Sequence, residues 1–182
     1  MRKSLLTLAP VALALLACSG TVNAANNAQI TITANVVAAT CDVSVSNPTL
    51  DLGNYAKSAF TGIATPVASS VQSFTVGLSN CEAPVAAGDT ANLVISGQTL
   101  GGNPNIFNST GTNTGVMISQ VSTPGIYLKA GDKLAVATAG DPAAAGDFNG
   151  KALSLQAGLA STSATPDIGA VSAPVVFSFA YN

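Results

Sequence analysis

The sequence predicts an all-β fold, an antiparallel β-sandwich of immunoglobulin-like type. Short runs rich in β-branched and apolar residues recur along the 182-residue chain, and pairs containing Gly, Pro, Asn or Asp separate them. Helical spacing is almost absent, apart from small Ala-rich pieces at 56–60 and 143–145. Many short strands at this spacing are typical of a sandwich. The expected strands are Val43–Val45, Thr49–Leu52, Ser73–Leu78, Ala91–Ser96, Val116–Val121, Ile126–Leu128, Ala152–Leu159 and Val175–Tyr181.

Two long polar stretches, 99–114 and 138–150, are expected to be surface loops. No internal repeat or linker divides the chain into two folded domains. A single hydrophobic core fits a chain of this length comfortably. We therefore expect one sandwich, preceded by the N-terminal segments described next.

Residues 1–24 are predicted to be a signal peptide. Arg2 and Lys3 are positively charged, the apolar run at 5–17 is too short to span a bilayer, and Val22-Asn23-Ala24 is a small-residue cleavage site. Lipid attachment at Cys18 is an alternative, because the three residues before it loosely resemble a bacterial lipoprotein site. The site after Ala24 fits better, so we expect cleavage there.

The exported chain begins with an alternating strand at 29–36. One face carries the four apolar side chains of Ile30, Ile32, Ala34 and Val36, at the period of two that a strand imposes. A strand at this place either completes the chain's own sheet or is lent to another molecule. These alternatives have different functional consequences.

Cys41 and Cys81 are the only cysteines that remain after cleavage. An even number of cysteines in an exported chain favours a disulfide, whereas a metal site needs more ligands and the sequence has no histidine. We therefore expect a structural Cys41–Cys81 bond, with two unpaired buried thiols as the alternative. Closing a loop of this size contributes about 4 kcal/mol in the chain-entropy model.

A second alternating strand ends the chain. Val175, Phe177, Phe179 and Tyr181 fall on one face of it. Three of these four are aromatic in a chain that has nine aromatic residues, which indicates that this face is buried.

Composition excludes several classes of function. The exported part has four lysines against eight acidic residues, a net charge of −4, and offers no basic patch for nucleic acid or an anionic membrane. The sequence has no histidine for general base catalysis, no acidic cluster at metal spacing and no phosphate-binding glycine loop. We therefore expect neither an enzyme nor a bound metal or cofactor.

The two alternating ends and the cysteine pair together resemble the type 1-like fimbrial subunits, or pilins, of the chaperone and usher pathway. The resemblance spans essentially all of the exported chain. Gly169, fourteenth from the end, and the penultimate Tyr181 match the family's C-terminal signature. The other matching segments are Val36-Val37-Ala38-Ala39-Thr40-Cys41, Asp51-Leu52-Gly53, Phe74–Cys81, Gly115-Val116-Met117-Ile118, Leu155-Gln156-Ala157 and Ala164-Thr165-Pro166.

The resemblance implies an incomplete immunoglobulin-like sandwich with an N-terminal donor-strand extension. Residues 25–38 would be that extension and residues 39–182 the pilin domain. The family's fold lacks its last strand, and a hydrophobic groove is left beside the C-terminal strand. The groove would accept a strand from a periplasmic chaperone and then from the next subunit, with Gly169 and the apolar face of 175–181 at the groove and the chaperone-binding edge. The chain departs from the family at Ala34, where glycine is common, and at Leu159, where many relatives carry an aromatic residue.

The expected function is a structural subunit of a bacterial surface fimbria that supports cell adhesion. Its expected partners are other fimbrial subunits, mostly copies of itself, together with the periplasmic chaperone and the outer-membrane usher that take it to the cell surface. The nearest alternative is a minor or adaptor subunit. A self-contained secreted or lipid-anchored sandwich, which uses residues 29–37 as its own strand, is a second alternative, and carbohydrate binding by the domain itself is a third.

Overall fold

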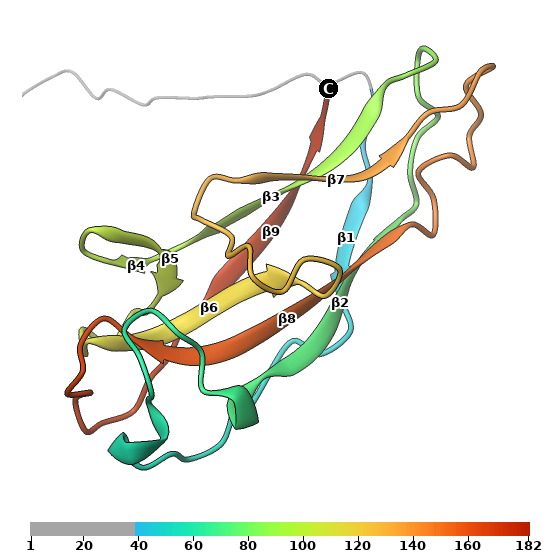
Figure 1. The fold of residues 1–182 in the computed structure, drawn as a ribbon. Helices are drawn as coiled ribbons and strands as arrows, with labels where there is room; N and C mark the ends of the chain where they lie inside the picture. Colours follow the sequence, from blue (N-terminus) through green and yellow to red (C-terminus); the bar gives the residue numbers. More distant parts are fainter. Residues whose placement is uncertain (1–38) are drawn as a thin grey trace, which may run out of the picture. The chain divides into compact units, whose positions relative to one another are not determined.

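The computed structural model describes residues 39–182, which form two antiparallel sheets packed face to face (Figure 1). The described chain is all-β apart from two short 3-10 turns, η1 (Lys57–Ala59) and η2 (Ala68–Ser70). The fold class predicted from the sequence is confirmed. The signal peptide, Cys18 and the four predicted donor residues Ile30, Ile32, Ala34 and Val36 lie outside the described residues.

The larger sheet has six strands in the order β1-β2-β8-β6-β5-β4, and the smaller has three in the order β7-β3-β9. Every strand pairing is antiparallel. The strands of the larger sheet are β1 (Asp42–Val45), β2 (Gln72–Ser79), β8 (Ala152–Ser161), β6 (Thr114–Gln120), β5 (Asn103–Phe107) and β4 (Thr99–Leu100). Those of the smaller sheet are β7 (Lys133–Thr138), β3 (Thr90–Gly97) and β9 (Val175–Tyr181).

The core lies between the two sheets and is built from the inward side chains of both. Strand β2 contributes Phe74, Val76 and Leu78, all 9% exposed or less, and the smaller sheet contributes Leu93 and Ile95, both fully buried. Because successive strand residues point to opposite faces, the period of two seen in the sequence becomes a buried layer in the fold. Burying each such side chain is worth about 1.5–3 kcal/mol.

Six of the eight predicted strands are present at nearly the expected positions. They correspond to β1, β2, β3, β6, β8 and β9, and the last of these spans 175–181 as predicted. Apart from Thr138, the last residue of β7, the predicted loop at 138–150 contains no strand or helix. The alternation of apolar and polar residues was therefore enough to place most of both sheets.

Two expected strands and one expected helical piece do not form. Thr49–Leu52 pairs with no described strand, and Ile126–Leu128 contributes a single bridge, from Tyr127 to Ser119. Residues 143–145 are not helical. The carboxylate of Asp147 accepts hydrogen bonds from the N–H groups of Gly140 and Ala144, which closes turns in this segment and satisfies main-chain donors without a helix.

The predicted loop at 99–114 is wrong, because it contains β4 and β5. The two strands form a hairpin over Gly101-Gly102, where Gly102 has a positive φ of 78°, a conformation that glycine adopts without strain. Ile106 and Phe107 on β5 are both fully buried. This adjacent apolar pair indicated a buried strand, but the sequence prediction missed it because the residues around the pair are polar. The sequence prediction also missed β7, a strand at the edge of the smaller sheet.

Candidate functional site

One edge of β9 has no partner among the strands of the described residues. This strand pairs with β3 through seven register positions, from Ala91 opposite Tyr181 to Gly97 opposite Val175. It ends the order β7-β3-β9, so no described strand pairs with its other edge. Strand β1 is likewise one edge of the larger sheet, and among residues 39–182 it pairs with β2 alone. Unpaired main-chain N–H and C=O groups along such edges can pair with another strand.

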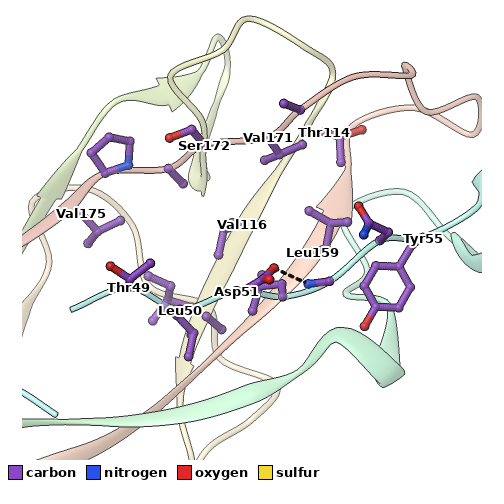
Figure 2. A pocket seen from close by; sticks show the side chains of 18 of the residues that line it. Thr49, Leu50, Asp51, Tyr55, Thr114, Val116, Leu159, Val171, Ser172 and Val175 are labelled. Atoms are coloured by element: carbon purple, nitrogen blue, oxygen red, sulfur yellow. Dashed lines mark hydrogen bonds between the residues drawn. The ribbon is translucent and has the colours of Figure 1, made fainter. Parts of the chain in front are cut away.

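A groove of about 1130 Å³ lies beside the free edge of β9. Its volume exceeds the range of about 300–1,000 Å³ that is common for small-molecule sites, which favours a segment of polypeptide as the occupant. Figure 2 shows the side chains of Leu50, Val116, Leu159 and Val175 gathered round this space. Its other apolar lining residues include Val45, Leu52, Phe60, Phe74, Ile118, Ala157, Val171 and Phe177.

The floor of the groove is part of the sandwich core. Phe74, Ile118 and Ala157 are each 9% exposed or less, whereas Val116 and Leu159 are half-buried and accessible from the groove. Leu159 lies directly opposite Val116 on the paired strands β8 and β6. An apolar floor exposed to water is costly, so an apolar strand that covers it would stabilise the fold.

The predicted C-terminal site residues do not all line the groove. Gly169, Val175 and Phe177 line it. Phe179 and Tyr181 lie farther along β9 and pack against the main core. All four apolar side chains of β9 therefore pack against the main core, but only Val175 and Phe177 also line the groove, a difference that the sequence pattern alone did not indicate.

The sequence prediction missed a second wall, formed by the segment 46–57. Residues 47–57 of this segment line the groove, although no residue in it belongs to a strand. Gln72 Nε2 donates a hydrogen bond to the Asp51 carbonyl at 2.7 Å, the Gly53 N–H donates to Asp51 Oδ1 at 2.9 Å, and the Tyr55 hydroxyl donates to the Ser69 carbonyl at 2.8 Å. These bonds hold the segment beside the groove.

The charged residues of the groove lie at its exposed margin. Asp51, Lys57 and Asp167 line it, and all three are exposed. The apolar floor carries no compensating charge among the described residues. A charged side chain on an inserted strand would consequently lose its hydration without gaining a partner.

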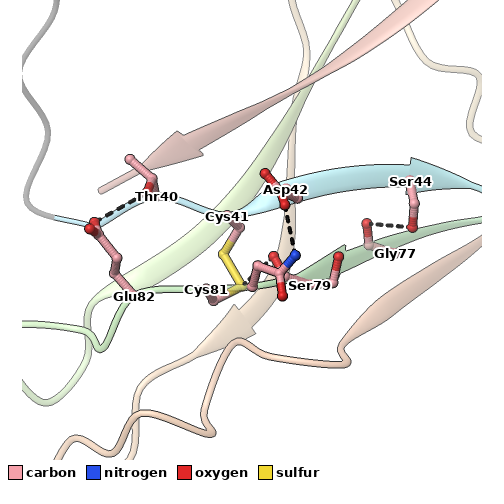
Figure 3. The surroundings of a disulfide bond; sticks show 9 residues. Thr40, Cys41, Asp42, Ser44, Gly77, Ser79, Cys81 and Glu82 are labelled. Atoms are coloured by element: carbon pink, nitrogen blue, oxygen red, sulfur yellow. Dashed lines mark hydrogen bonds between the residues drawn. A yellow bond between two sulfur atoms is a disulfide. The ribbon is translucent and has the colours of Figure 1, made fainter.

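The predicted disulfide is present between Cys41 and Cys81 (Figure 3). It joins the chain just before β1 to the chain just after β2. Next to it, the Glu82 N–H donates to the Thr40 carbonyl at 2.9 Å, and Thr40 Oγ1 donates to Glu82 Oε2 at 3.1 Å. The bond and its neighbours tie the first described residues to the end of β2.

The last residue of β9 is held by a hydrogen-bond cluster. The Tyr181 hydroxyl donates to Asp89 Oδ2 and accepts from the Val85 N–H at 3.0 Å. The same carboxylate oxygen accepts from the N–H groups of Val85 and Ala86. The bonds from Tyr181 and then Ala86 hold the pKa of Asp89 below its ordinary value of 3.8, and the bond to Asp89 raises the pKa of Tyr181 above 10.0.

Nothing in the described part of the chain is arranged for metal chemistry. Among residues 39–182, no three His, Cys, Asp or Glu side chains lie close enough together to hold an ion. No helix among them is long and apolar enough to cross a membrane.

The family model of fimbrial proteins matches residues 27–182 of this chain. The chain belongs to the fimbrial protein family. This membership confirms the resemblance to type 1-like subunits of the chaperone and usher pathway, and it makes the chain a structural subunit of a surface pilus. Membership of this family also implies a structural, non-enzymatic role.

Two solved structures show that this fimbrial protein shares its fold with other pilus proteins. The P pilus rod subunit PapA is 21% identical, with 85% of this chain and 99% of that chain covered and a TM-score of 0.53. An antigen and type I fimbria protein of Burkholderia pseudomallei is 17% identical, with 79% and 99% covered and the same TM-score. Among curated proteins, none matches this fimbrial protein.

Proposed function

We propose that this fimbrial protein is the repeating rod subunit of a bacterial surface fimbria and that it polymerises by donor-strand exchange. The open groove beside the unpaired edge of β9 is the observation that carries the proposal. Residues 25–38 of one subunit would enter the groove of its neighbour and add a strand to β9, with Ile30, Ile32, Ala34 and Val36 against the apolar floor. Strand addition of this kind combines main-chain hydrogen bonds with pockets for alternate side chains.

The size of the apolar contact supports a long-lived joint between subunits. Ile30, Ile32 and Val36 are each worth about 1.5–3 kcal/mol if fully buried, or about 5–9 kcal/mol in total before the cost of ordering the strand. Each main-chain hydrogen bond to β9 adds about 0.5–1.5 kcal/mol. A neighbour's strand would therefore stay in place once it had entered.

The export route belongs to the same proposal. A chain with an open groove exposes apolar surface and unpaired strand edges, and both promote aggregation. We propose that the signal peptide directs the chain to the periplasm, that a chaperone covers the groove, and that an outer-membrane usher exchanges the chaperone for the next subunit. In this scheme Gly169, Val175 and Phe177 line the acceptor groove, and β9 is the edge that the chaperone engages.

Deletion of residues 25–38 from the exported chain tests donor-strand exchange. The truncated subunit keeps its groove but has no strand to lend, so we expect electron microscopy of cells that produce it alone to show no fibres. The parent chain is the control. Fibres of parental length would overturn the proposal. So would a purified parent chain that is a stable monomer and keeps its stability after the deletion.

A deletion of the whole subunit distinguishes a rod subunit from a minor one. The described residues form a single sandwich, and the family match runs from residue 27, inside the proposed donor extension, to residue 182. We expect the deletion to abolish the entire fibre. Loss of the tip or of adhesion alone, with the shaft intact, would assign the chain to a minor or adaptor position.

A further inference from the structure

The contact between Tyr181 and Asp89 joins the end of β9 to the loop before β3. Tyr181 is the last residue of β9 and lies opposite Ala91, whereas Asp89 immediately precedes β3. The Tyr181 ring also meets the fully buried ring of Phe148 edge-on, with 6.2 Å between ring centroids. The hydroxyl therefore reaches the carboxylate from a ring whose position the core already restricts.

The apolar pattern of β9 does not by itself define how the strand is paired with β3. A slip of one residue would turn the apolar face outward, but a slip of two residues keeps the same face inward. Phe177 and Phe179 are two positions apart, so such a slip puts one phenylalanine in the place of the other. Packing in the middle of the strand consequently discriminates weakly between these registers.

The contact in the segment just before β9 does not resolve this ambiguity. The Ser172 carbonyl accepts hydrogen bonds from the Ser109 N–H at 2.8 Å and from Ser109 Oγ at 3.0 Å. These bonds reach a main-chain carbonyl, which every residue has, so they do not recognise which residue lies there. The hydroxyl of Tyr181 is different, because a two-residue slip in either direction moves it about 6.6 Å along the strand, away from Asp89. In one of the two directions Phe179, which has no hydroxyl, takes its place opposite Ala91.

We propose that the hydrogen bond between Tyr181 and Asp89 is a register lock that selects one pairing of β9 with β3. By selecting that pairing, the lock holds Val175 and Phe177 at the groove wall, where an incoming strand meets them. This role in assembly rests on the proposed function. The lock itself is a property of the isolated sandwich, and the two can be tested separately.

Cysteine pairs across the outer face of the smaller sheet report the register. Val94 lies opposite Ser178, and both point away from the core. The pair Val94→Cys with Ser178→Cys reports the observed register, and Val94→Cys with Val176→Cys or with Ala180→Cys reports a slip of two residues. Residues that are diagonal neighbours on paired strands, two positions away from the directly opposite residue, lie about 7–8 Å apart. The Cα atoms of a disulfide usually lie within about 6.8 Å of each other, so each cysteine pair cross-links preferentially in the register that places its two members directly opposite.

The experiment introduces each cysteine pair into the full chain, oxidises the periplasm of cells that produce it, and maps the cross-links by mass spectrometry. In the parent background we expect the 94–178 cross-link to dominate. Tyr181→Phe keeps the ring against Phe148 but removes the hydroxyl, and we expect it to raise a slipped cross-link several-fold. Asp89→Ala should have the same effect.

Tyr127→Phe is the matched control. It also removes one tyrosine hydroxyl, but Tyr127 packs against the separate cluster of Ile106, Met117 and Ala160 and lines no part of the groove. We expect this variant to leave the cross-link ratio at the parental value. If Asp89→Ala fails to accumulate, Tyr181→Phe alone still tests the register lock. An unchanged ratio of cross-links in Tyr181→Phe overturns it.

The role in assembly has its own readout, the length of fibres made by Tyr181→Phe. Shorter fibres together with a shifted cross-link ratio support both the register lock and its role in assembly. A shifted ratio with fibres of parental length overturns the role in assembly. If the parent chain itself makes no fibres, the proposed function fails while the cross-link ratio still tests the lock.

Discussion

The rings of Phe74 on β2 and Phe177 on β9 meet across the sandwich, with 6.1 Å between their centroids. Phe74 is 9% exposed, whereas Phe177 is half-buried, and both line the groove. The groove is therefore continuous with the core where the two sheets touch. An inserted strand would cover side chains that already support the fold.

Phe177→Ala should weaken both the domain and the groove. It removes the ring pair with Phe74 and leaves a gap in the groove wall, so we expect a loss of about 1.5–3 kcal/mol in the free energy of unfolding of the assembled subunit. Urea unfolding measures this loss. Val176→Ala is the control, because Val176 is the next residue on β9 and is 57% exposed. Equal losses in the two variants would contradict the assignment of Phe177 to the groove.

Ile32→Asp should block the joining of subunits. Its carboxylate would enter a groove whose charged residues lie only at the exposed margin, so it would be desolvated without a partner. We expect short or absent fibres by electron microscopy, with the variant subunit's own groove unaffected. Thr33→Asp, which places the same charge on the opposite face of the predicted strand, should have a much smaller effect. Parental fibre length in Ile32→Asp would show that a different face inserts.

Loss of the disulfide should lower the amount of subunit that accumulates. The bond closes a loop with a sequence separation of 40 residues, and the chain-entropy model assigns about 4 kcal/mol to it. The double variant Cys41→Ser with Cys81→Ser avoids a lone thiol and is measured by immunoblotting of periplasm and fibre fractions. Normal levels of assembled fibre would show that the bond is dispensable.

Acid should weaken the contact between Tyr181 and Asp89. Hydrogen bonding holds the pKa of Asp89 below its ordinary value of 3.8, so the ionised carboxylate favours the folded state at pH values above 3.8. That contribution is lost as the pH falls through the lowered pKa of the folded state. We expect the unfolding free energy of Asp89→Asn to lack this part of the parent's dependence on pH. Parallel curves for the two proteins below pH 3.8 would contradict this assignment.

The alternation of apolar and polar residues in the sequence predicted the strands correctly where one face of the strand is buried. Val175 to Tyr181 alternates cleanly, and β9 spans those residues. Phe74, Val76 and Leu78 are likewise a period-two set on β2, and all three are buried. The period-two pattern did not predict strands in which buried and exposed residues do not alternate. Strand β5 carries an adjacent buried pair, Ile106 and Phe107, in a polar stretch.

Thr49–Leu52 shows the opposite error. Its composition predicted a strand, but in the described chain it has no neighbouring strand with which to pair. A strand needs a partner for its main-chain hydrogen bonds, and no local sequence supplies one. The segment instead became a wall of the groove, a role that its apolar residues fit but that their spacing did not indicate.

The sequence by itself determined the all-β class, most of the strands, the disulfide partners and the resemblance to fimbrial subunits, because these depend on side-chain type and local period. Only the tertiary structure decided which edge of which sheet remains open, which half of the β9 face lines the groove, and that Tyr181 meets Asp89 from 92 positions away. These features depend on how distant segments are brought together by the packing of the two sheets. Periodicity determines which face a strand buries, but it does not determine which strand lies beside it.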